Sequence, residues 1–154
     1  NYYGSDKPGF IYADTDSIHC DIPIEDIKMV EIDDNDFCHW KIESFWDTAI
    51  FTRQKTYIEH ITHENQKAID KPYYDVKCAG MPKRCKELFV RSMNTDELTE
   101  EEIKANKYTE EELEFLSTTR SLEDFTIGLT VPSKLLPKRI KGGVLLVPTT
   151  YEMR

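Results

Sequence analysis

The sequence of 154 residues lacks the features that would place it in several specialised protein classes. No apolar run approaches the roughly 20 residues that a membrane-spanning helix requires, and the first residues do not resemble a secretory signal. The cysteines form no C-x-x-C pair, so the spacing typical of a zinc site is absent. We therefore expect a cytoplasmic protein without membrane contact, whose free, buried thiols are Cys20, Cys38, Cys78 and Cys85.

Acidic residues outnumber basic ones, 29 against 20, but the distribution of the basic residues is more informative than their total. The net charge is −9, and residues 94–116 carry nine acids against two lysines. Seven of the nine net negative charges therefore lie in this one segment. Cations cluster instead in residues 77–91 and 134–141. Two basic stretches of this kind can contact the phosphates of a nucleic acid.

The residue patterns that are present predict an α+β fold. Segments 10–22 and 46–62 are rich in the residues that favour strands, and a polar loop over 63–71 is expected to lead into a further strand at 73–78. Residues 83–93 have the pattern of a basic helix that follows Pro82. The residues expected to face inward from this helix are Cys85, Leu88 and Phe89.

The second half of the sequence predicts short helices followed by a β-ribbon. Thr99 with Glu102 and Thr109 with Glu112 have the spacing of capping boxes, which predicts two short helices within the acidic stretch 94–118. We interpret them as a solvated helical pair in preference to a partner-binding element. From Phe125 onward the residues favour an extended ribbon that turns at the glycine pair 142–143.

The most informative segment is Tyr12 to His19, which predicts two strands joined by an acidic turn. Asp14 and Asp16 lie in this turn, where Asp and Thr side chains can hydrogen-bond to the local backbone. A Mg²⁺ site needs only one or two carboxylates in addition to substrate phosphates. In phosphoryl transfer, two such ions about 3.5–4 Å apart activate the attacking oxygen and stabilise the leaving group. The turn is therefore a candidate metal site.

The two acids also allow other interpretations. An EF-hand loop is excluded, because Ile18 occupies a ligand position and His19 stands where a glycine is required. A phosphatase of the Asp-x-Asp type and a metal-dependent glycosyltransferase remain minor alternatives, since no βαβ pattern supports them. An acidic turn that binds no ligand is the plain structural alternative.

The residues Tyr-x-Asp-Thr-Asp-Ser at 12–17 resemble palm motif C of the family B DNA polymerases. The sequence Lys-Thr-Tyr at 55–57 resembles the Lys-x-Tyr motif with which these polymerases hold the primer terminus. Residues 76–81, together with the Arg-Gln-Lys-Thr-Tyr segment 53–57, are similar to the protein-primed branch, the phi-twenty-nine-type phage enzymes. In the protein-primed branch, the segment that resembles residues 76–81 marks the passage from palm to thumb.

The resemblance implies a division of the chain into two parts. Residues 1–78 would form the C-terminal part of an antiparallel palm sheet, and residues 79–154 a thumb of β-ribbon and helices. The acidic stretch at about 94–118 departs from the family pattern and is interpreted as an insertion. If the run 46–62 is one strand, Arg53, Lys55 and Tyr57 share one face along about 13 Å.

The resemblance also implies a chemistry and its partners. A primer 3′ hydroxyl would attack the α-phosphate of a deoxynucleoside triphosphate, with two Mg²⁺ ions, or Mn²⁺, as cofactors. Asp16 would be the direct metal ligand and Asp14 its support, while Tyr12, Thr15 and Ser17 would shape the motif. A terminal protein primer is an expected partner, in the bacterial cytoplasm that hosts a phage or prophage. The residues expected to contact primer-template DNA are Arg53, Lys55, Tyr57, Lys77, Lys83, Arg84, Lys134, Lys138, Arg139 and Lys141.

Other motifs of the family B polymerases are missing from the sequence. We find neither the upstream metal-binding Asp of motif A, nor the nucleotide-binding Lys of motif B, nor a proofreading exonuclease. We therefore expect a C-terminal fragment of a larger polymerase that is inactive alone, because one hairpin cannot hold two ions and a triphosphate. The alternative is a DNA-binding or protein-interaction module derived from a polymerase without its chemistry.

Overall fold

The computed structural model describes residues 9–27, 31–33 and 35–154. Residues 1–8, the start of the expected palm part, therefore lie outside the described residues. The described residues form antiparallel strands and a few short helices, so the predicted α+β class is confirmed. In chain order, the elements are β1 (Phe10–Asp14), β2 (Ser17–Cys20), the 3₁₀ helix η1 (Ile24–Asp26), β3 (Ser44–Arg53), β4 (Thr56–Glu64), β5 (Lys67–Cys78), α1 (Lys83–Met93), α2 (Glu100–Asn106), α3 (Glu110–Leu116), the 3₁₀ helix η2 (Leu122–Asp124), β6 (Thr130–Ile140) and β7 (Gly143–Glu152).

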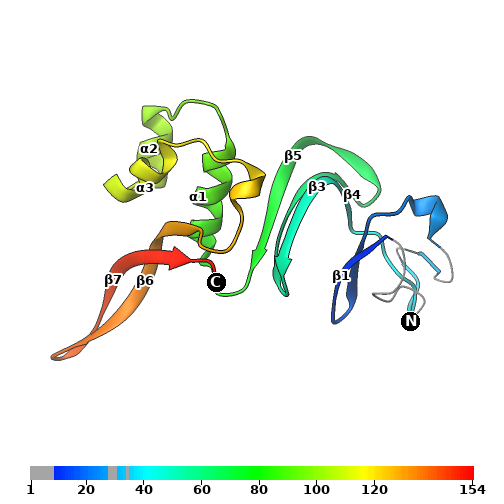
Figure 1. The fold of residues 1–154 in the computed structure, drawn as a ribbon, viewed down its shortest axis with the longest axis horizontal. Helices are drawn as coiled ribbons and strands as arrows, with labels where there is room; N and C mark the ends of the chain where they lie inside the picture. Colours follow the sequence, from blue (N-terminus) through cyan, green and yellow to red (C-terminus); the bar gives the residue numbers. More distant parts are fainter. Residues whose placement is uncertain (1–8, 28–30, 34) are drawn as a thin grey trace.

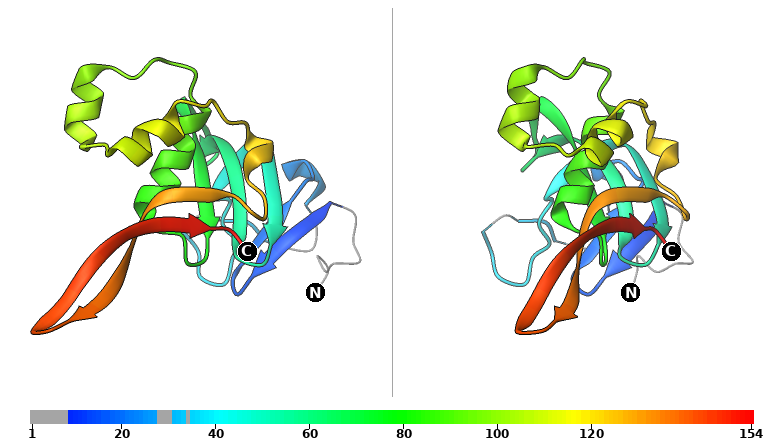
Figure 2. Two further views of the ribbon diagram at one scale, coloured as in Figure 1. Left: turned by 60° about the vertical axis from the view of Figure 1, so that its left-hand side comes forward. Right: turned by 90° about the vertical axis from the view of Figure 1, so that its left-hand side faces the viewer.

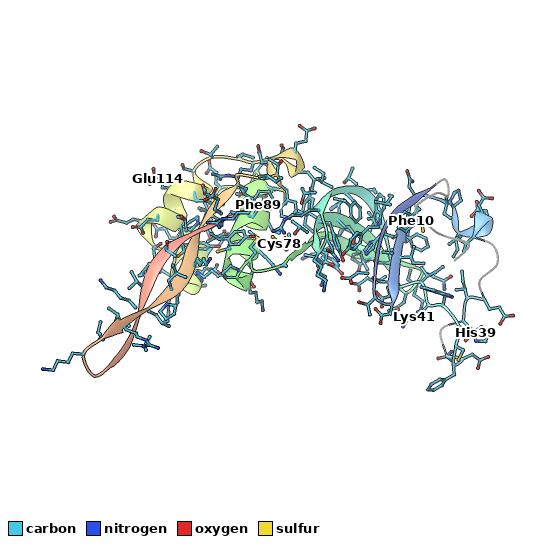
Figure 3. All side chains as sticks on the ribbon, turned by 60° about the horizontal axis from the view of Figure 1, so that its bottom comes forward. Phe10, His39, Lys41, Cys78, Phe89 and Glu114 are labelled. Atoms are coloured by element: carbon cyan, nitrogen blue, oxygen red, sulfur yellow. The ribbon has the colours of Figure 1, made fainter. Side chains whose placement is uncertain are left out.

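The strands of the described residues form three separate antiparallel sheets. These are the hairpin β1–β2, the sheet β3–β4–β5 and the ribbon β6–β7. The three-stranded sheet lies in the middle of the molecule, between the β1–β2 hairpin on one side and the helices and ribbon on the other (Figure 1). Figure 3 accordingly places Phe10 and Lys41 at the opposite end of the molecule from Glu114.

The expected single strand over residues 46–62 is wrong, because the chain reverses at Gln54 and Lys55. Arg53 pairs with Thr56 across this turn, and Lys55 adopts a φ of 56°. Arg53, Lys55 and Tyr57 therefore do not form a line on one strand face. The turn lacks glycine, proline and asparagine, the residues by which a sequence normally marks a turn.

The expected polar loop over residues 63–71 is also wrong. Strand β4 continues to Glu64 and β5 begins at Lys67, so that only Asn65 and Gln66 form the connection. Both have positive φ, 47° and 64°, as in a type I′ turn whose twist suits a hairpin. Pro72 is tolerated within β5 because this strand lies at the edge of the sheet.

The hydrophobic core lies where α1 packs against the sheet and the base of the ribbon. Cys85, Leu88 and Phe89 face into it, which confirms the predicted inward face of α1. Phe125 is fully buried and its ring lies 5.7 Å from that of Phe89. The ribbon therefore begins at Thr130 and not at Phe125. The other core residues are Ile58, Val76, Cys78, Met81, Phe115, Val131, Tyr151 and Met153.

The cysteines are free, but they are not all buried. Cys78 and Cys85 lie in the core, whereas Cys20 is half-buried and Cys38 is exposed. The expectation of burial is thus wrong for Cys38. This residue lies in an exposed segment of the connection between β2 and β3, where the neighbouring Phe37 is 96% exposed.

The acidic stretch packs onto the body of the protein. Its two short helices begin at Thr99 and Thr109, as the capping pattern predicts. The box at Thr109 is complete, whereas Glu102 does not return a side-chain bond to Thr99 because its carboxylate pairs with Arg91, with Nε and Oε1 2.6 Å apart. On α3, Phe115 and Glu112 are buried. A solvated helical pair is therefore an incomplete description of this segment.

The β6–β7 ribbon projects from the body of the molecule (Figure 2). Ile140 pairs with Gly143 across the turn Lys141–Gly142, so the expected turn at the glycine pair is confirmed. Gly142 has a φ of 92°, which a residue with a side chain rarely adopts. Every residue from 135 to 146 is exposed. Among the described helices, none is long and apolar enough to cross a membrane.

Candidate functional site

The two acids of the candidate metal site lie at the tip of the β1–β2 hairpin. Asp14 ends β1 and pairs with Ser17, so that Thr15 and Asp16 alone make the turn. The Thr15 hydroxyl donates to Asp14 Oδ1 at 3.0 Å, and the Ser17 hydroxyl donates to the Asp14 carbonyl at 3.2 Å. Thr15 has a φ of 47°, and these local bonds help to hold its backbone in that conformation.

The donor chemistry of this tip fits a divalent cation. Asp16 is exposed and accepts no hydrogen bond from another described residue, while Asp14 is half-buried beside it in the turn. Carboxylate oxygens are the ligands that Mg²⁺ prefers, and one or two suffice when a substrate supplies the others. No group of three His, Cys, Asp or Glu side chains with metal-binding geometry occurs among the described residues. The chain therefore offers a partial site of two carboxylates.

An aromatic cluster packs this hairpin against the β3–β4 hairpin. The Tyr12 ring lies 5.5 Å from His19 and 5.5 Å from Tyr57, measured between ring centroids. Phe51 stacks on Tyr57 at 5.1 Å, and His19 meets Tyr57 at 4.9 Å. Tyr12 therefore packs between the acidic hairpin and the β3–β4 hairpin, and its role in shaping the motif stays a prediction.

Hydrogen bonds continue this contact from the Lys55 turn to the Asp14 carboxylate. The backbone N–H of Lys55 donates to the Tyr12 hydroxyl at 2.9 Å, and that hydroxyl lies 3.4 Å from Asp14 Oδ2. On the other side, the N–H of Ala79 donates to the Lys55 carbonyl at 3.1 Å. These partners are distant in sequence, and they bring the Lys-Thr-Tyr segment to the acidic turn even though it is not a straight strand.

Tyr57 keeps its proton in this environment. Burial, followed by the negative charges of Glu59 and Asp75, raises the pKa of Tyr57 to about 12. Asp14 contributes to the same shift, which places the phenol within the electrostatic field of the acidic turn. Near neutral pH, Tyr57 is therefore a neutral hydrogen-bond donor.

A hydrogen-bonded pair that the sequence analysis did not identify also joins the two hairpins. His19 Nδ1 on β2 lies 2.5 Å from Glu59 Oε1 on β4, and Glu59 is only 3% exposed. The strand pattern places His19 on the face opposite Ile18, but nothing in the sequence pairs it with a residue 40 positions later. Only the tertiary structure identifies this contact.

Tyr151 forms a joint between the sheet and the ribbon. Its hydroxyl lies 3.1 Å from the Cys78 thiol, and Lys134 Nζ lies 5.7 Å from its ring centroid. Burial and the Cys78 thiol raise the pKa of Tyr151 to about 12, whereas the positive charge of Arg53 acts in the opposite direction. Arg53 of β3 and Lys134 of β6 therefore approach the same tyrosine from two elements.

Among the predicted DNA contacts around α1, one residue already pairs with other residues of the protein. Arg84 donates from Nε to Glu112 Oε2 at 2.7 Å and from Nη2 to the carbonyl of Asn106 at 2.8 Å. The predicted contact of Arg84 with DNA stays a prediction, and its guanidinium already has partners within the fold. Lys77 and Lys83 are exposed, each 3.7 Å from a neighbouring carboxylate.

The predicted cations of the ribbon do not all share one face. Successive side chains of a strand alternate between its two faces, so Lys134 and Lys138 lie on one face of β6 and Arg139 on the other. Lys141 occupies the turn at the tip. The structure thus places two lysines on one face of β6, Arg139 on the opposite face and Lys141 at the tip, and the contact of these cations with DNA stays a prediction.

A cavity of about 500 Å³ lies beside the candidate metal site. Asp16 and Lys77 both contribute to its lining, together with the His19–Glu59 pair and a set of isoleucines from β2 and the following connection. The carboxylate of Asp16 and the side chain of Lys77 thus border the same cavity.

Comparison with known proteins identifies the relatives of this chain. The DNA polymerase of Streptococcus phage Cp-1 is 30% identical over 145 residues, and that of Bacillus phage phi29 is 28% identical over 157 residues. Each match covers 94% of this chain but only 19% and 21% of the relative. No family model matches the sequence.

Solved structures give the same result. A phi29 DNA polymerase in an orthorhombic crystal form has a TM-score of 0.62 at 28% identity, with 94% of this chain and 22% of that one covered. The ternary complex with primer-template DNA and incoming nucleotide substrates has a TM-score of 0.58. The chain spans about a fifth of the length of these relatives. Over 94% of its length, this chain is therefore a homologue of the phage DNA polymerases of the Cp-1 and phi29 type.

Proposed function

We propose that this chain is a palm-to-thumb segment of a phage DNA polymerase of the protein-primed branch, in which Asp14 and Asp16 hold catalytic metal ions. The palm part comprises residues 1–78 and the thumb part residues 79–154. The observation that carries the proposal is the contact between the acidic turn and the Lys55 turn, through the bond of the Lys55 N–H to the Tyr12 hydroxyl. A polymerase must hold a metal ion and the primer end close together, and this contact joins the two candidate elements.

The substrates follow from the same arrangement. The related phi29 polymerase has been solved with primer-template DNA and with incoming nucleotides. For this chain we propose the same ligand classes, primer-template DNA and deoxynucleoside triphosphates. The exposed Lys55 and the neutral Tyr57 hydroxyl would hold the primer terminus, while Lys77 borders the cavity that also contains Asp16.

In the proposed reaction, the primer 3′ hydroxyl attacks the α-phosphate of the nucleotide and pyrophosphate leaves. Asp16 would bind Mg²⁺ or Mn²⁺ directly, and Asp14 would support it. When bound, two such ions neutralise the charge that develops on the transferred phosphate. The protein orients this centre, since Thr15 and Tyr12 contact the Asp14 carboxylate and the aromatic cluster positions Tyr57.

Further cations would provide affinity without sequence specificity. Arg53, Lys83, Lys134, Lys138, Arg139 and Lys141 are proposed as contacts to DNA phosphates. Contacts of this kind position a protein on DNA but do not read its sequence. A terminal protein that supplies the priming hydroxyl is the proposed protein partner, in the cytoplasm of the bacterial host.

The test is primer extension by the longer polymerase that we propose carries this segment. Asp16→Ala should lower the rate by on the order of 10²–10³ or more, because a group that stabilises transition-state charge is lost. Binding of primer-template DNA should change little, since affinity is spread over many cations. Asp21→Ala is the matched control, because Asp21 is an exposed acid that follows β2. Full synthesis by the Asp16→Ala enzyme would refute the metal assignment.

The second candidate is a DNA-binding module that lacks polymerase chemistry. The exposed cations of the ribbon favour it, because they do not depend on the acidic turn. The two candidates differ in the assay above. Primer extension that depends on Asp16 supports the polymerase, whereas DNA binding by a longer protein that never extends a primer supports the binding module.

A further inference from the structure

The β6–β7 ribbon projects from the body, and its direction must be set at its base. Every residue from 135 to 146 is exposed, so the outer ribbon leaves its side chains in solvent. Ile140 lies seven positions after Ser133 along β6, which corresponds to roughly 23 Å at about 3.3 Å per residue. A change of about 10° at the base would move the tip by about 4 Å, given that strand rise.

The base of the ribbon contains a backbone irregularity. The β6–β7 register shifts between Pro132 and Lys134, and Ser133 at this bulge has a φ of 85°. A non-glycine residue in this region is strained and persists only where its surroundings hold it. Bulges bend a strand and redirect it. Groups that stabilise the backbone conformation of Ser133 therefore also stabilise the bend of the ribbon.

Glu112 accepts the hydrogen bond of the Ser133 side chain, and the Cys85 thiol bonds to the carbonyl of the neighbouring Pro132 at 3.0 Å. The Ser133 hydroxyl donates to Glu112 Oε2 at 2.7 Å, and Glu112 is only 2% exposed. The same carboxylate accepts two bonds from Arg84, at 2.7 and 3.1 Å, and one from the Thr109 N–H at 3.0 Å. One buried carboxylate thus connects α1, α3 and β6.

A second pair attaches the acidic helices to α1. Arg91 donates from Nε to Glu102 Oε1 at 2.6 Å and from Nη2 to Glu102 Oε2 at 3.2 Å. The acidic helices are therefore fixed to α1 at two positions, through Glu102 and Glu112. Most of the other acids of this segment are exposed, so these two differ from them in burial and in pairing.

We propose that the acidic segment 94–116 is a buttress for the ribbon, and that Glu112 is a positioning residue that fixes the direction in which the ribbon leaves the body. Glu112 acts through Ser133 and the bulge, and it does not itself touch DNA. The geometric part of the proposal is independent of the proposed polymerase function. Only the consequence for DNA, in which a misdirected ribbon releases it faster, rests on that function.

The experiment measures ribbon direction in the chain itself. Spin labels introduced as non-natural amino acids at Lys141, in the ribbon turn, and Lys104, exposed on α2, report one distance across the molecule. Wild type and Glu110→Gln should give the same narrow distance distribution, because Glu110 is an exposed acid on the same helix. Glu112→Gln and Ser133→Ala should each broaden or shift it by at least about 4 Å, the displacement expected from the strand rise.

Two further measurements keep the outcome decisive. Circular dichroism and thermal unfolding identify the temperature range in which each variant is folded, and distances are compared only there. If Glu112→Gln does not fold, Ser133→Ala carries the test, because it removes one bond and leaves the Arg84–Glu112 pair in place. An unchanged narrow distribution in folded Ser133→Ala would overturn the proposal.

A DNA measurement separates this inference from the proposed function. The rate at which a primer-template duplex dissociates should rise in Ser133→Ala and remain at the wild-type value in Glu110→Gln. If the distance distribution broadens and the dissociation rate does not change, the buttress is supported and the proposed role of the ribbon in DNA binding fails. If the distribution stays narrow, the buttress fails whatever DNA does.

Discussion

At the scale of single residues, Asp16 and Glu112 show how the environment assigns different roles to the same kind of group. Asp16 is exposed at the tip of a hairpin, whereas Glu112 is buried among hydrogen-bond donors. An exposed carboxylate without a partner can bind a cation from solution. A buried carboxylate that accepts several bonds is committed to the fold.

The role of Asp16 predicts local metal binding by the chain. Mn²⁺ added to the ¹⁵N-labelled protein should broaden the amide resonances of residues 13–17 through its paramagnetism, because the two carboxylates of the turn form a partial site. Asp16→Asn should abolish this local broadening and Asp21→Asn should leave it. If Asp16→Asn retains the broadening, these acids are not the metal site. The exposed acids of segment 94–116 serve as an internal reference for nonspecific binding.

The pairing of Glu112 predicts a dependence of stability on pH. Burial alone would raise the pKa of Glu112, but hydrogen bonds from Arg84, Ser133 and the Thr109 N–H outweigh it and lower the pKa from 4.5 to about 2. A carboxyl with a lowered folded-state pKa stabilises the protein above its unfolded-state pKa and loses this contribution as the pH falls. We therefore expect a contribution on the order of 3 kcal/mol that is complete above about pH 4.5 and disappears towards pH 2.

Denaturant unfolding of wild type and Glu112→Gln at several pH values measures this contribution. The difference in the free energy of unfolding should be large at pH 6 and should shrink steadily between about pH 4.5 and pH 2. Glu110→Gln is the control with the same change in charge. A difference that does not vary with pH would show that Glu112 stabilises the protein by packing alone.

At the scale of elements, side chains join units that share no backbone ladder. The β1–β2 hairpin and the β3–β4–β5 sheet are separate sheets. An isolated two-stranded hairpin is marginally stable in water. The aromatic cluster and the His19–Glu59 pair therefore determine where the acidic turn lies relative to the Lys55 turn.

Substitution of His19 should loosen this hairpin selectively. His19→Phe keeps an aromatic ring but removes the ring nitrogens, so it leaves the buried Glu59 without its partner, which should cost about 1–3 kcal/mol of the free energy of unfolding. Amides of β1 and β2 should exchange hydrogen faster, while those of the β6–β7 ribbon should not change. His60→Phe is a close control, because His60 pairs with Asp47 at 2.7 Å but at a more exposed position. The substitution of His60 should cost at most about 1 kcal/mol. Equal effects of the two substitutions would show that the His19–Glu59 pair does not specifically hold the β1–β2 hairpin against the sheet.

At the scale of the whole molecule, opposite charges lie on different parts. The acids of segment 94–116 belong to α2, α3 and their connections, whereas Lys138, Arg139 and Lys141 lie on the outer ribbon. Figure 1 shows the helices and the outer ribbon as separate parts of the molecule. A net charge of −9 is therefore compatible with a basic surface that contacts DNA phosphates.

This separation predicts a salt-dependent affinity for DNA. The double substitution of Lys138 and Lys141 by alanine should weaken binding of duplex DNA, and the slope of log affinity against log salt should decrease by about 0.9 for each phosphate contact removed. Fluorescence anisotropy at several salt concentrations measures both quantities. Lys104→Ala, within the acidic segment, should leave the slope at its wild-type value. An unchanged slope in the double variant would exclude these lysines from the contact.

The sequence predicted the elements whose signals are local. The acidic hairpin, helix α1 and the ribbon turn are each marked by strand alternation, a helical apolar face or a glycine pair within a few residues. The turn at Gln54 and Lys55 has no such mark. Its left-handed lysine is held by Tyr12 and Ala79, which are distant in the chain, so no local pattern could reveal it.

The sequence by itself thus determined the α+β class, the two acids of the turn, the Lys-Thr-Tyr segment and the resemblance that the phage relatives confirmed, because these depend on residue type and spacing. Tertiary structure alone decided that the two motifs meet, that His19 pairs with Glu59, that Arg84 is occupied, and that Glu112 holds the base of the ribbon. The physical reason is that a hydrogen bond or an ion pair depends on distance in space. Glu112 and Ser133 are 21 residues apart, and only the folded chain brings them within 2.7 Å.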